Sequence, residues 1–173
     1  ISNERCLWLC FWRNIREKMM KDLEKRKNPE QDLIKSFCDR LGAVQCSNCR
    51  AKNHADIEYI NDNGDFCMVE AKTHLSGDGH NAVHKLFGEL LKLTGYQSSK
   101  THENIKYQLL IDNRPDETGK RGGQFFHELL VKHIPKDKFI AFGKIVPIDK
   151  VIEFDMKTIK EFSWEEFYNL EEK

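Results

Sequence analysis

The sequence predicts one α/β domain in which helices cover both faces of a central mixed β-sheet, a three-layer α/β/α arrangement. Its 173 residues allow one sizeable core and are too few for two ordinary domains. Short apolar runs typical of buried strands alternate with stretches whose apolar residues recur at helical spacing. Two of these runs flank Asp62-Asn-Gly64, a sequence typical of the turn in a β-hairpin.

Each expected element has its own signal. The second helix should begin after Asn28, a good N-cap, with Pro29 suited to the first helical position and Gln31 completing a capping-box pattern. Gly42 is a suitable end for it. Apolar periodicity predicts further helices over 4–27, 80–95, 122–134 and 158–170. Apolar runs predict strands over 43–46, 54–60, 67–72, 107–111, 139–142 and 145–148.

Charge and cysteine content restrict the class of protein without deciding its function. The 28 Lys and Arg residues balance the 28 Asp and Glu residues, but residues 151–173 hold 3 basic and 7 acidic side chains, which leaves +4 on residues 1–150. That excess is weak support for a phosphate-bearing partner, because nucleic-acid binding depends on local patches. Six cysteines in a chain of this length predict a reducing, cytoplasmic or nuclear compartment rather than a disulfide scaffold.

Two segments point to other classes that we do not favour. Residues 7–12 are apolar but far too short to span a membrane, and they lack a signal-peptide cleavage pattern. Cys46-Ser-Asn-Cys49 has the spacing of half a zinc knuckle, but no second pair matches it. Two incidental thiols are therefore the preferred interpretation, with zinc as the alternative. The chain begins at Ile1 rather than Met, as expected of a segment from a larger protein.

The hairpin carries the most informative side chains. Asp56 lies on its first strand, and Glu70 and Lys72 lie on its second strand, directly after an apolar run. Charges are seldom placed in a buried strand without a partner or a metal. Two converging carboxylates can hold a hard divalent cation, and a neighbouring lysine can orient or deprotonate a water or neutralise charge on a phosphate. The alternative is an ordinary solvated hairpin, in which acids and lysines are common.

The turn decides whether Asp56 and Glu70 converge. A two-residue Asn-Gly turn would pair Asp56 with Ala71 and separate the two acids, since a one-residue slip reverses every face of a strand. A three-residue loop with Gly64 in the left-handed conformation would put Asp56 opposite Glu70. Asn-Gly normally favours the first arrangement, but we predict the three-residue loop or a bulge.

Asp56 followed by Glu70-Ala-Lys72 on a hairpin resembles the core motif of the PD-(D/E)XK nuclease superfamily, whose members have the restriction-endonuclease-like fold. Ala55 stands where the motif's name has proline, a departure that the family widely tolerates. The resemblance implies a single nuclease domain. It divides the chain into an N-terminal helical extension, a catalytic core and a C-terminal elaboration, at residues 1–27, 28–112 and 113–173.

What the resemblance implies for mechanism is metal-dependent hydrolysis of a phosphodiester by an endonuclease. Asp56, Glu70 and the carbonyl of Ala71 would hold Mg²⁺ or Mn²⁺. Lys72 would position the attacking water or stabilise the charge that develops on the phosphate. The first three residues are thus expected metal ligands, and Lys72 is an expected catalytic residue.

Glu30 is a further candidate for the same site. It precedes Leu33, Ile34 and Phe37 by three, four and seven residues and so continues their apolar stripe. Many members of the superfamily carry a glutamate on the helix before the hairpin, which implies a second metal ion or a water-mediated contact for Glu30. The alternative is an acid that stabilises the first turn of its helix.

Other polar residues near the hairpin have two interpretations each. Glu58 shares a face with Asp56 and is an auxiliary ligand or, as we prefer, an acid at the edge of the core. Arg50 and Lys52 precede the hairpin and His54 starts its first strand, which makes all three candidate nucleic-acid contacts. Solvated loop charges and a structural histidine are the alternatives.

The resemblance leaves the substrate open. Double-stranded or structured DNA is the first choice, and cutting both strands of a duplex usually requires a homodimer. RNA cleavage by the same fold is a second enzymatic possibility. A catalytically silent member of the fold, serving as a nucleic-acid or protein-binding module, is an alternative of a different class. No membrane partner is expected.

Overall fold

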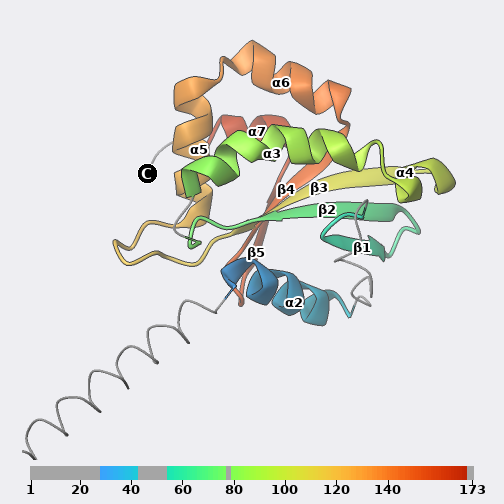
Figure 1. Cartoon of the computed structure of the whole chain (residues 1–173), viewed down its shortest axis with the longest axis horizontal. Helices are drawn as coiled ribbons and strands as arrows, with labels where there is room; N and C mark the ends of the chain where they lie inside the picture. Colours follow the sequence, from blue (N-terminus) through green and yellow to red (C-terminus); the bar gives the residue numbers. More distant parts are fainter. Residues whose placement is uncertain (1–27, 43–53, 77–78, 171–173) are drawn as a thin grey trace, which may run out of the picture.

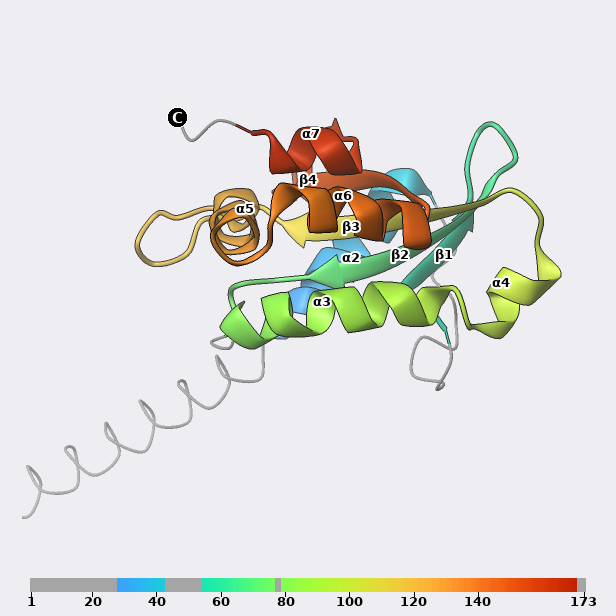
Figure 2. The same cartoon turned by 90° about the horizontal axis from the view of Figure 1, so that it is seen from above.

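In the described part of the chain, five strands form one mixed β-sheet with helices on both faces, which confirms the predicted α/β class (Figure 1, Figure 2). The computed structural model describes residues 28–42, 54–76 and 79–170. The two outer strand pairs are antiparallel and the two inner pairs are parallel, so the C-terminal ends of the three central strands meet at one edge. In spatial order the strands are β1 Ile57–Ile60, β2 Phe66–Lys72, β3 Ile105–Asp112, β4 Ile148–Phe154 and β5 Ile159–Phe162.

Helix α2 (Pro29–Leu41) covers one face of the sheet (Figure 1). Both of its predicted ends are confirmed. The side chain of Asn28 accepts hydrogen bonds from the backbone N–H groups of Glu30 and Gln31, and Gly42 ends the helix with φ 63°. The apolar side of α2 packs on the sheet in a core formed by Leu33, Ile34, Phe37, Cys38, Ile57, Val69, Ala71, Leu110, Ile152 and Phe154.

The opposite face is covered by α3 (Gly79–Leu93), α5 (Gly122–His133), α6 (Lys136–Ile145) and α7 (Trp164–Tyr168), as Figure 2 shows. The short α4 (Gln97–Thr101) connects α3 to β3 and was not expected from the sequence. Trp164 illustrates how this layer is held together. Its ring stacks on Phe139 with centroids 4.0 Å apart, and its Nε1 donates to the Phe139 carbonyl at 2.7 Å. Tryptophan rings buried in this way contribute both area and a satisfied polar group.

The strands predicted over 139–142 and 145–148 are largely wrong. Residues 139–145 belong to helix α6, and only Ile148 belongs to a strand. Phe139 is buried and Phe142 packs against the same core, three residues further on, which is the spacing of one helical face. A short apolar run does not distinguish a strand from a buried helix, so periodicity alone misassigned this segment.

The closing helix predicted over 158–170 is also wrong in part. Residues 159–162 form β5 and pair with β4, and the helix spans only Trp164–Tyr168. The boundary has a local cause. Ser163 caps the helix by accepting a hydrogen bond from the Glu166 N–H, while the Glu166 side chain accepts one from the Ser163 N–H. This capping box fixes where the helix begins. The segment 113–173, expected to be an elaboration, therefore supplies two of the five strands.

Several predicted features lie outside the described residues. They are the helix over 4–27, the strand over 43–46, the cysteine pair Cys46 and Cys49, and the candidate nucleic-acid contacts Arg50 and Lys52. Within the described part of the chain, no helix is both long and apolar enough to cross a membrane.

Candidate active site

The hairpin between β1 and β2 has the predicted three-residue loop. Ile57 pairs with Val69 and Ile60 with Phe66, and Gly64 adopts the left-handed conformation with φ 83°. The side chain of Asn61 explains why the two-residue turn is not formed. It accepts hydrogen bonds from the N–H groups of residues 63 and 65, at 3.0 and 2.9 Å, and so stabilises the longer loop.

This register aligns Asp56 with Glu70 across the hairpin. Asp56 directly precedes β1, and its Oδ2 accepts a hydrogen bond from the Ala71 N–H at 2.8 Å. Burial, and then the negative charge of Asp56, raise the pKa of Glu70 to about 8. Burial also raises the pKa of Asp56, against the effect of the Ala71 hydrogen bond. Each carboxyl group therefore holds its proton more tightly than an ordinary carboxyl group does.

Lys72 follows Glu70 by two residues and lies on the same face of β2. Its ammonium contacts three oxygens: Glu70 Oε1 at 2.6 Å, the Ala71 carbonyl at 2.9 Å and Glu89 Oε2 at 2.8 Å. An ammonium has three hydrogens, so these contacts satisfy it completely. Burial alone would lower the pKa of Lys72, but the neighbouring carboxylates raise it above its usual value. Lys72 is therefore a buried cation.

Glu89 is the residue that the sequence analysis missed. It lies on α3 and reaches Lys72 across the space between that helix and β2, which lie side by side (Figure 2). The signal was present in the sequence. Glu89 comes three residues after Leu86 and four before Leu93, both fully buried, so it continues an inward stripe as Glu30 does.

A pocket of about 230 Å³ lies at the C-terminal end of β2, bordered by α2 and α3. Glu30 reaches it from the first turn of α2, so the structure brings this predicted residue to the same pocket as Lys72. Burial raises the pKa of Glu30, the charge of Lys72 opposes that shift, and Asp56 and Glu89 add to it. The pocket is lined by Glu30, Lys72, Thr73, Ser76, Asn81, Ala82, Lys85 and Glu89.

A contact between Arg114 and the buried Asp112 ties α2 to the sheet beside this pocket. Asp112, at the end of β3, is fully buried and accepts hydrogen bonds from Thr73 Oγ1 at 3.0 Å and from Arg114 Nε at 2.8 Å. The Arg114 guanidinium also donates to the Pro29 carbonyl at 2.9 Å. One polar network thus joins the ends of β2 and β3 to the first turn of α2.

The oxygen donors at the hairpin fit a hard divalent cation. Glu70 Oε1 and the Ala71 carbonyl already surround one cation, the ammonium of Lys72, and Asp56 lies opposite Glu70. Two carboxylates and a carbonyl oxygen are ligands that Mg²⁺ accepts. Among the residues that the structure describes, no three histidine, cysteine, aspartate or glutamate side chains are arranged to hold an ion. Glu30 therefore borders the pocket without completing such a group.

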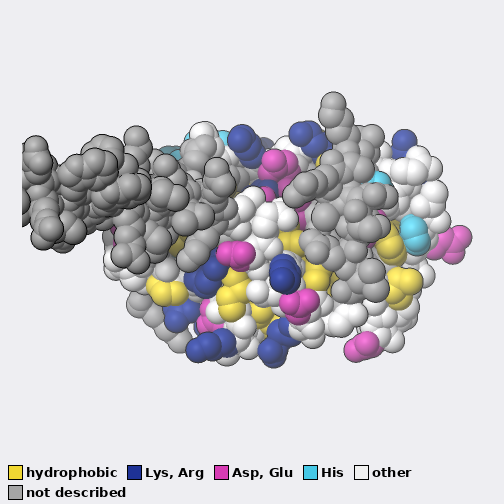
Figure 3. Space-filling view, turned by 60° about the horizontal axis from the view of Figure 1, so that its bottom comes forward, with side chains coloured by type: hydrophobic (Ala, Val, Ile, Leu, Met, Phe, Trp, Pro, Cys, Tyr) yellow, Lys and Arg dark blue, Asp and Glu magenta, His cyan; other side chains and the backbone are white. Residues whose placement is uncertain are grey.

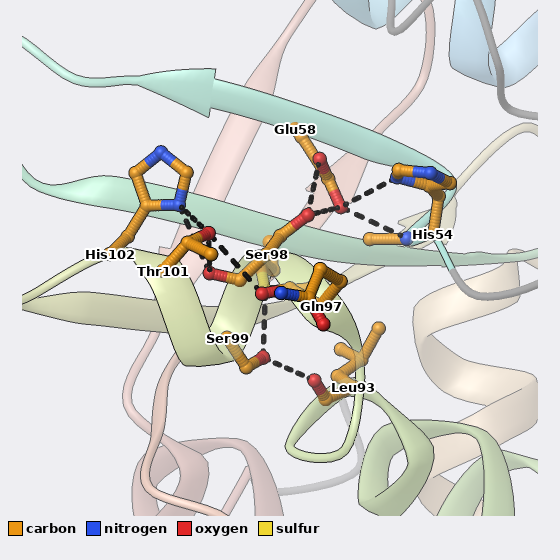
Figure 4. Close-up of polar contacts among 10 residues, drawn as sticks. His54, Glu58, Leu93, Gln97, Ser98, Ser99, Thr101 and His102 are labelled. Carbon is orange, nitrogen blue, oxygen red and sulfur yellow. Dashed lines mark hydrogen bonds and ion pairs between the residues drawn. The ribbon is translucent and has the colours of Figure 1, made fainter.

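Glu58 and His54 contact each other away from Glu70 and Lys72, beside Ser98 of α4. Figure 4 shows the carboxylate of Glu58 between His54 and Ser98. Both oxygens of Glu58 accept from Ser98 Oγ at 3.0 Å, and Glu58 Oε1 lies 3.7 Å from His54 Nδ1. The contact attaches α4 to β1, which agrees with the interpretation of Glu58 as an acid at the edge of the core.

Comparison with known protein families, with curated proteins and with solved structures gave no match.

Proposed function

We propose that this chain is a metal-dependent endonuclease of the PD-(D/E)XK type, with the restriction-endonuclease-like fold. The observation that carries the proposal is the register of the hairpin, which sets Asp56 opposite Glu70 and leaves Lys72 beside both. The surrounding layout supports it, since the mixed sheet has α2 on one face and α3 on the other, with a pocket between them at the end of β2.

The residues of the hairpin would bind the metal and orient the reacting groups. Mg²⁺ or Mn²⁺, held by Asp56, Glu70 and the carbonyl of Ala71, would supply a Lewis acid for the phosphate and lower the pKa of a water. Lys72 is a cation at neutral pH, so it would donate hydrogen bonds and stabilise negative charge rather than act as a general base. Glu30 would serve a second ion or hold a water at the mouth of the pocket.

Charge on the surface supports a nucleic-acid substrate only locally. On the side viewed in Figure 3, the described Lys and Arg side chains lie among Asp and Glu side chains. Lys85 is the lysine other than Lys72 in the described lining of the pocket, and it is a suitable contact for a backbone phosphate. Duplex or structured DNA, cut by a homodimer, remains the preferred substrate, and RNA is the alternative.

The test is cleavage by matched variants. The protein would be incubated with supercoiled plasmid, branched DNA and single-stranded RNA, each with Mg²⁺, Mn²⁺ or EDTA. Glu70→Gln and Lys72→Ala should abolish metal-dependent cleavage with a much smaller effect on binding. Glu165→Gln and Lys144→Ala change exposed side chains on α7 and α6 and should cut normally. Cleavage that persists in the two site variants would refute the proposal.

A silent nucleic-acid or protein-binding module is the second candidate. Calorimetric titration with Mn²⁺ separates it from the enzyme, because a silent module should show no binding that depends on Asp56 and Glu70. The intact arrangement of both carboxyl groups with Lys72 favours the enzyme.

A further inference from the structure

We propose that Glu89 is a positioning residue that takes over Lys72 when a cation binds between Glu70 and the Ala71 carbonyl. Metal loading is then an exchange of partners at Lys72 rather than the filling of an open site. The inference rests on the proposed function and extends it to a residue on α3, outside the hairpin motif.

The Lys72 ammonium occupies oxygens that the metal would need. Two of the three oxygens that Lys72 contacts, Glu70 Oε1 and the Ala71 carbonyl, are the expected metal ligands. A divalent cation on those oxygens would repel the ammonium strongly at such short range. We therefore expect Lys72 to give up both contacts as the cation binds.

Burial requires the Lys72 ammonium to keep a charged partner. Lys72 is only 5% exposed, and a charged group in such a place is costly unless it keeps a partner. Glu89 Oε2 is that partner, 2.8 Å from the ammonium. Glu89 lies on the 15-residue helix α3 and lines the same pocket as Lys72. It keeps the lysine charged and beside the pocket after the other two contacts are lost.

Once released from Glu70 and Ala71, Lys72 can donate hydrogen bonds to the substrate complex. With Glu89 as its one remaining partner, the ammonium has two unused N–H donors next to the pocket. Those donors are then available to a phosphate oxygen or a water of the substrate complex. Without the carboxylate of Glu89, Lys72 would compete with the metal for Glu70 and Ala71.

A double-mutant cycle tests this exchange. Calorimetry would measure Mn²⁺ affinity in the wild type, Glu89→Gln, Lys72→Met and the double variant. Glu89→Gln should weaken binding by at least about tenfold, the change expected from losing one charge-assisted hydrogen bond. Lys72→Met should tighten binding. In the Lys72→Met background, Glu89→Gln should change the affinity by less than about threefold, because no lysine is left to be held.

Two controls make the cycle specific. Lys85→Met removes a lysine from the same pocket, one helical turn from Glu89, and it should tighten Mn²⁺ binding less than Lys72→Met does. Thermal unfolding in EDTA checks that each variant is folded. If Glu89→Gln does not fold, Glu89→Asp keeps the charge on a shorter side chain and should show a weaker form of the same dependence on Lys72.

The outcomes separate the two proposals. If Glu89→Gln weakens Mn²⁺ binding equally with and without Lys72, Glu89 is a direct ligand or a general source of charge, and the exchange is refuted. If the wild type shows no Mn²⁺ binding that depends on Asp56 and Glu70, the proposed function fails and the exchange fails with it.

Discussion

Glu70→Gln should make the metal-free protein more stable than the wild type at alkaline pH. The glutamine keeps an oxygen for Lys72 Nζ, and its amide N–H₂ can donate to the neighbouring carboxyl group of Asp56. The substitution is therefore a mimic of the protonated form. Unlike the native side chain, it has no charge to lose or gain.

The raised pKa of Glu70 determines how the stability of the wild type changes with pH. The pKa of Glu70 rises from an ordinary 4.5 to about 8 on folding, so between these values the folded state binds more protons than the unfolded state. Stability then falls as pH rises, by about 1.4 kcal/mol per pH unit. From about pH 6 to about pH 8 the loss amounts to about 2 kcal/mol, because the slope flattens near the folded-state pKa. Glu70→Gln should not show this loss.

The assay is urea denaturation in EDTA at about pH 6, 7 and 8, with Glu165→Gln as an exposed glutamate control. Histidines and other titrating groups are common to all three proteins, so the readout is the difference in unfolding free energy between wild type and variant. That difference should change with pH for Glu70→Gln and stay constant for the control. A constant difference for both would show that Glu70 is ionised at neutral pH.

Three further predictions test the site and the packing. Mn²⁺ binding near pH 7 should release a proton from the hairpin carboxyls, so the apparent affinity should rise toward pH 8, and calorimetry in buffers of different ionisation enthalpy would count the proton. Gly122→Ala would put a methyl group 1.8 Å from the Asp112 carbonyl oxygen and should cost about 3 kcal/mol in urea unfolding, whereas Gly88→Ala, with nothing within 4 Å, should stabilise the helix by about 1 kcal/mol. Trp164→Ala removes the ring stacked on Phe139 and should cost about 3–5 kcal/mol, with a smaller cost for Trp164→Phe.

Local chemistry made part of the fold predictable. Asn28 and Gly42 bound α2 because a side-chain cap and a left-handed glycine act within a few residues of the chain. The hairpin loop was also predictable, although the argument for it came from the need to align Asp56 with Glu70 rather than from the Asn61 side chain that stabilises it.

The wrong or missing predictions concern residues whose structure or role depends on tertiary contacts. The run at 139–142 is helical because its aromatic residues pack on one side against α3 and α7, information that a short apolar run does not contain. Glu89 was missed because its partner, Lys72, lies on another element 17 residues earlier, although its place on a buried stripe was visible. Spacing within one helix indicates which side chains face the core, but it does not identify the residues on other elements that they contact.

Arg114 has a consequence for reading mutational data on this fold. Its guanidinium links Asp112 to the Pro29 carbonyl, and Glu30 is the next residue along α2. In a loss-of-function screen, substitutions of Arg114 would be grouped with those of Asp56 and Glu70. Arg114 acts differently, because it fixes the position of the first turn of α2. The two kinds of variant differ in what they damage. Loss of Arg114 shifts α2 and disturbs the mouth of the pocket, but it leaves the expected metal ligands on the hairpin intact.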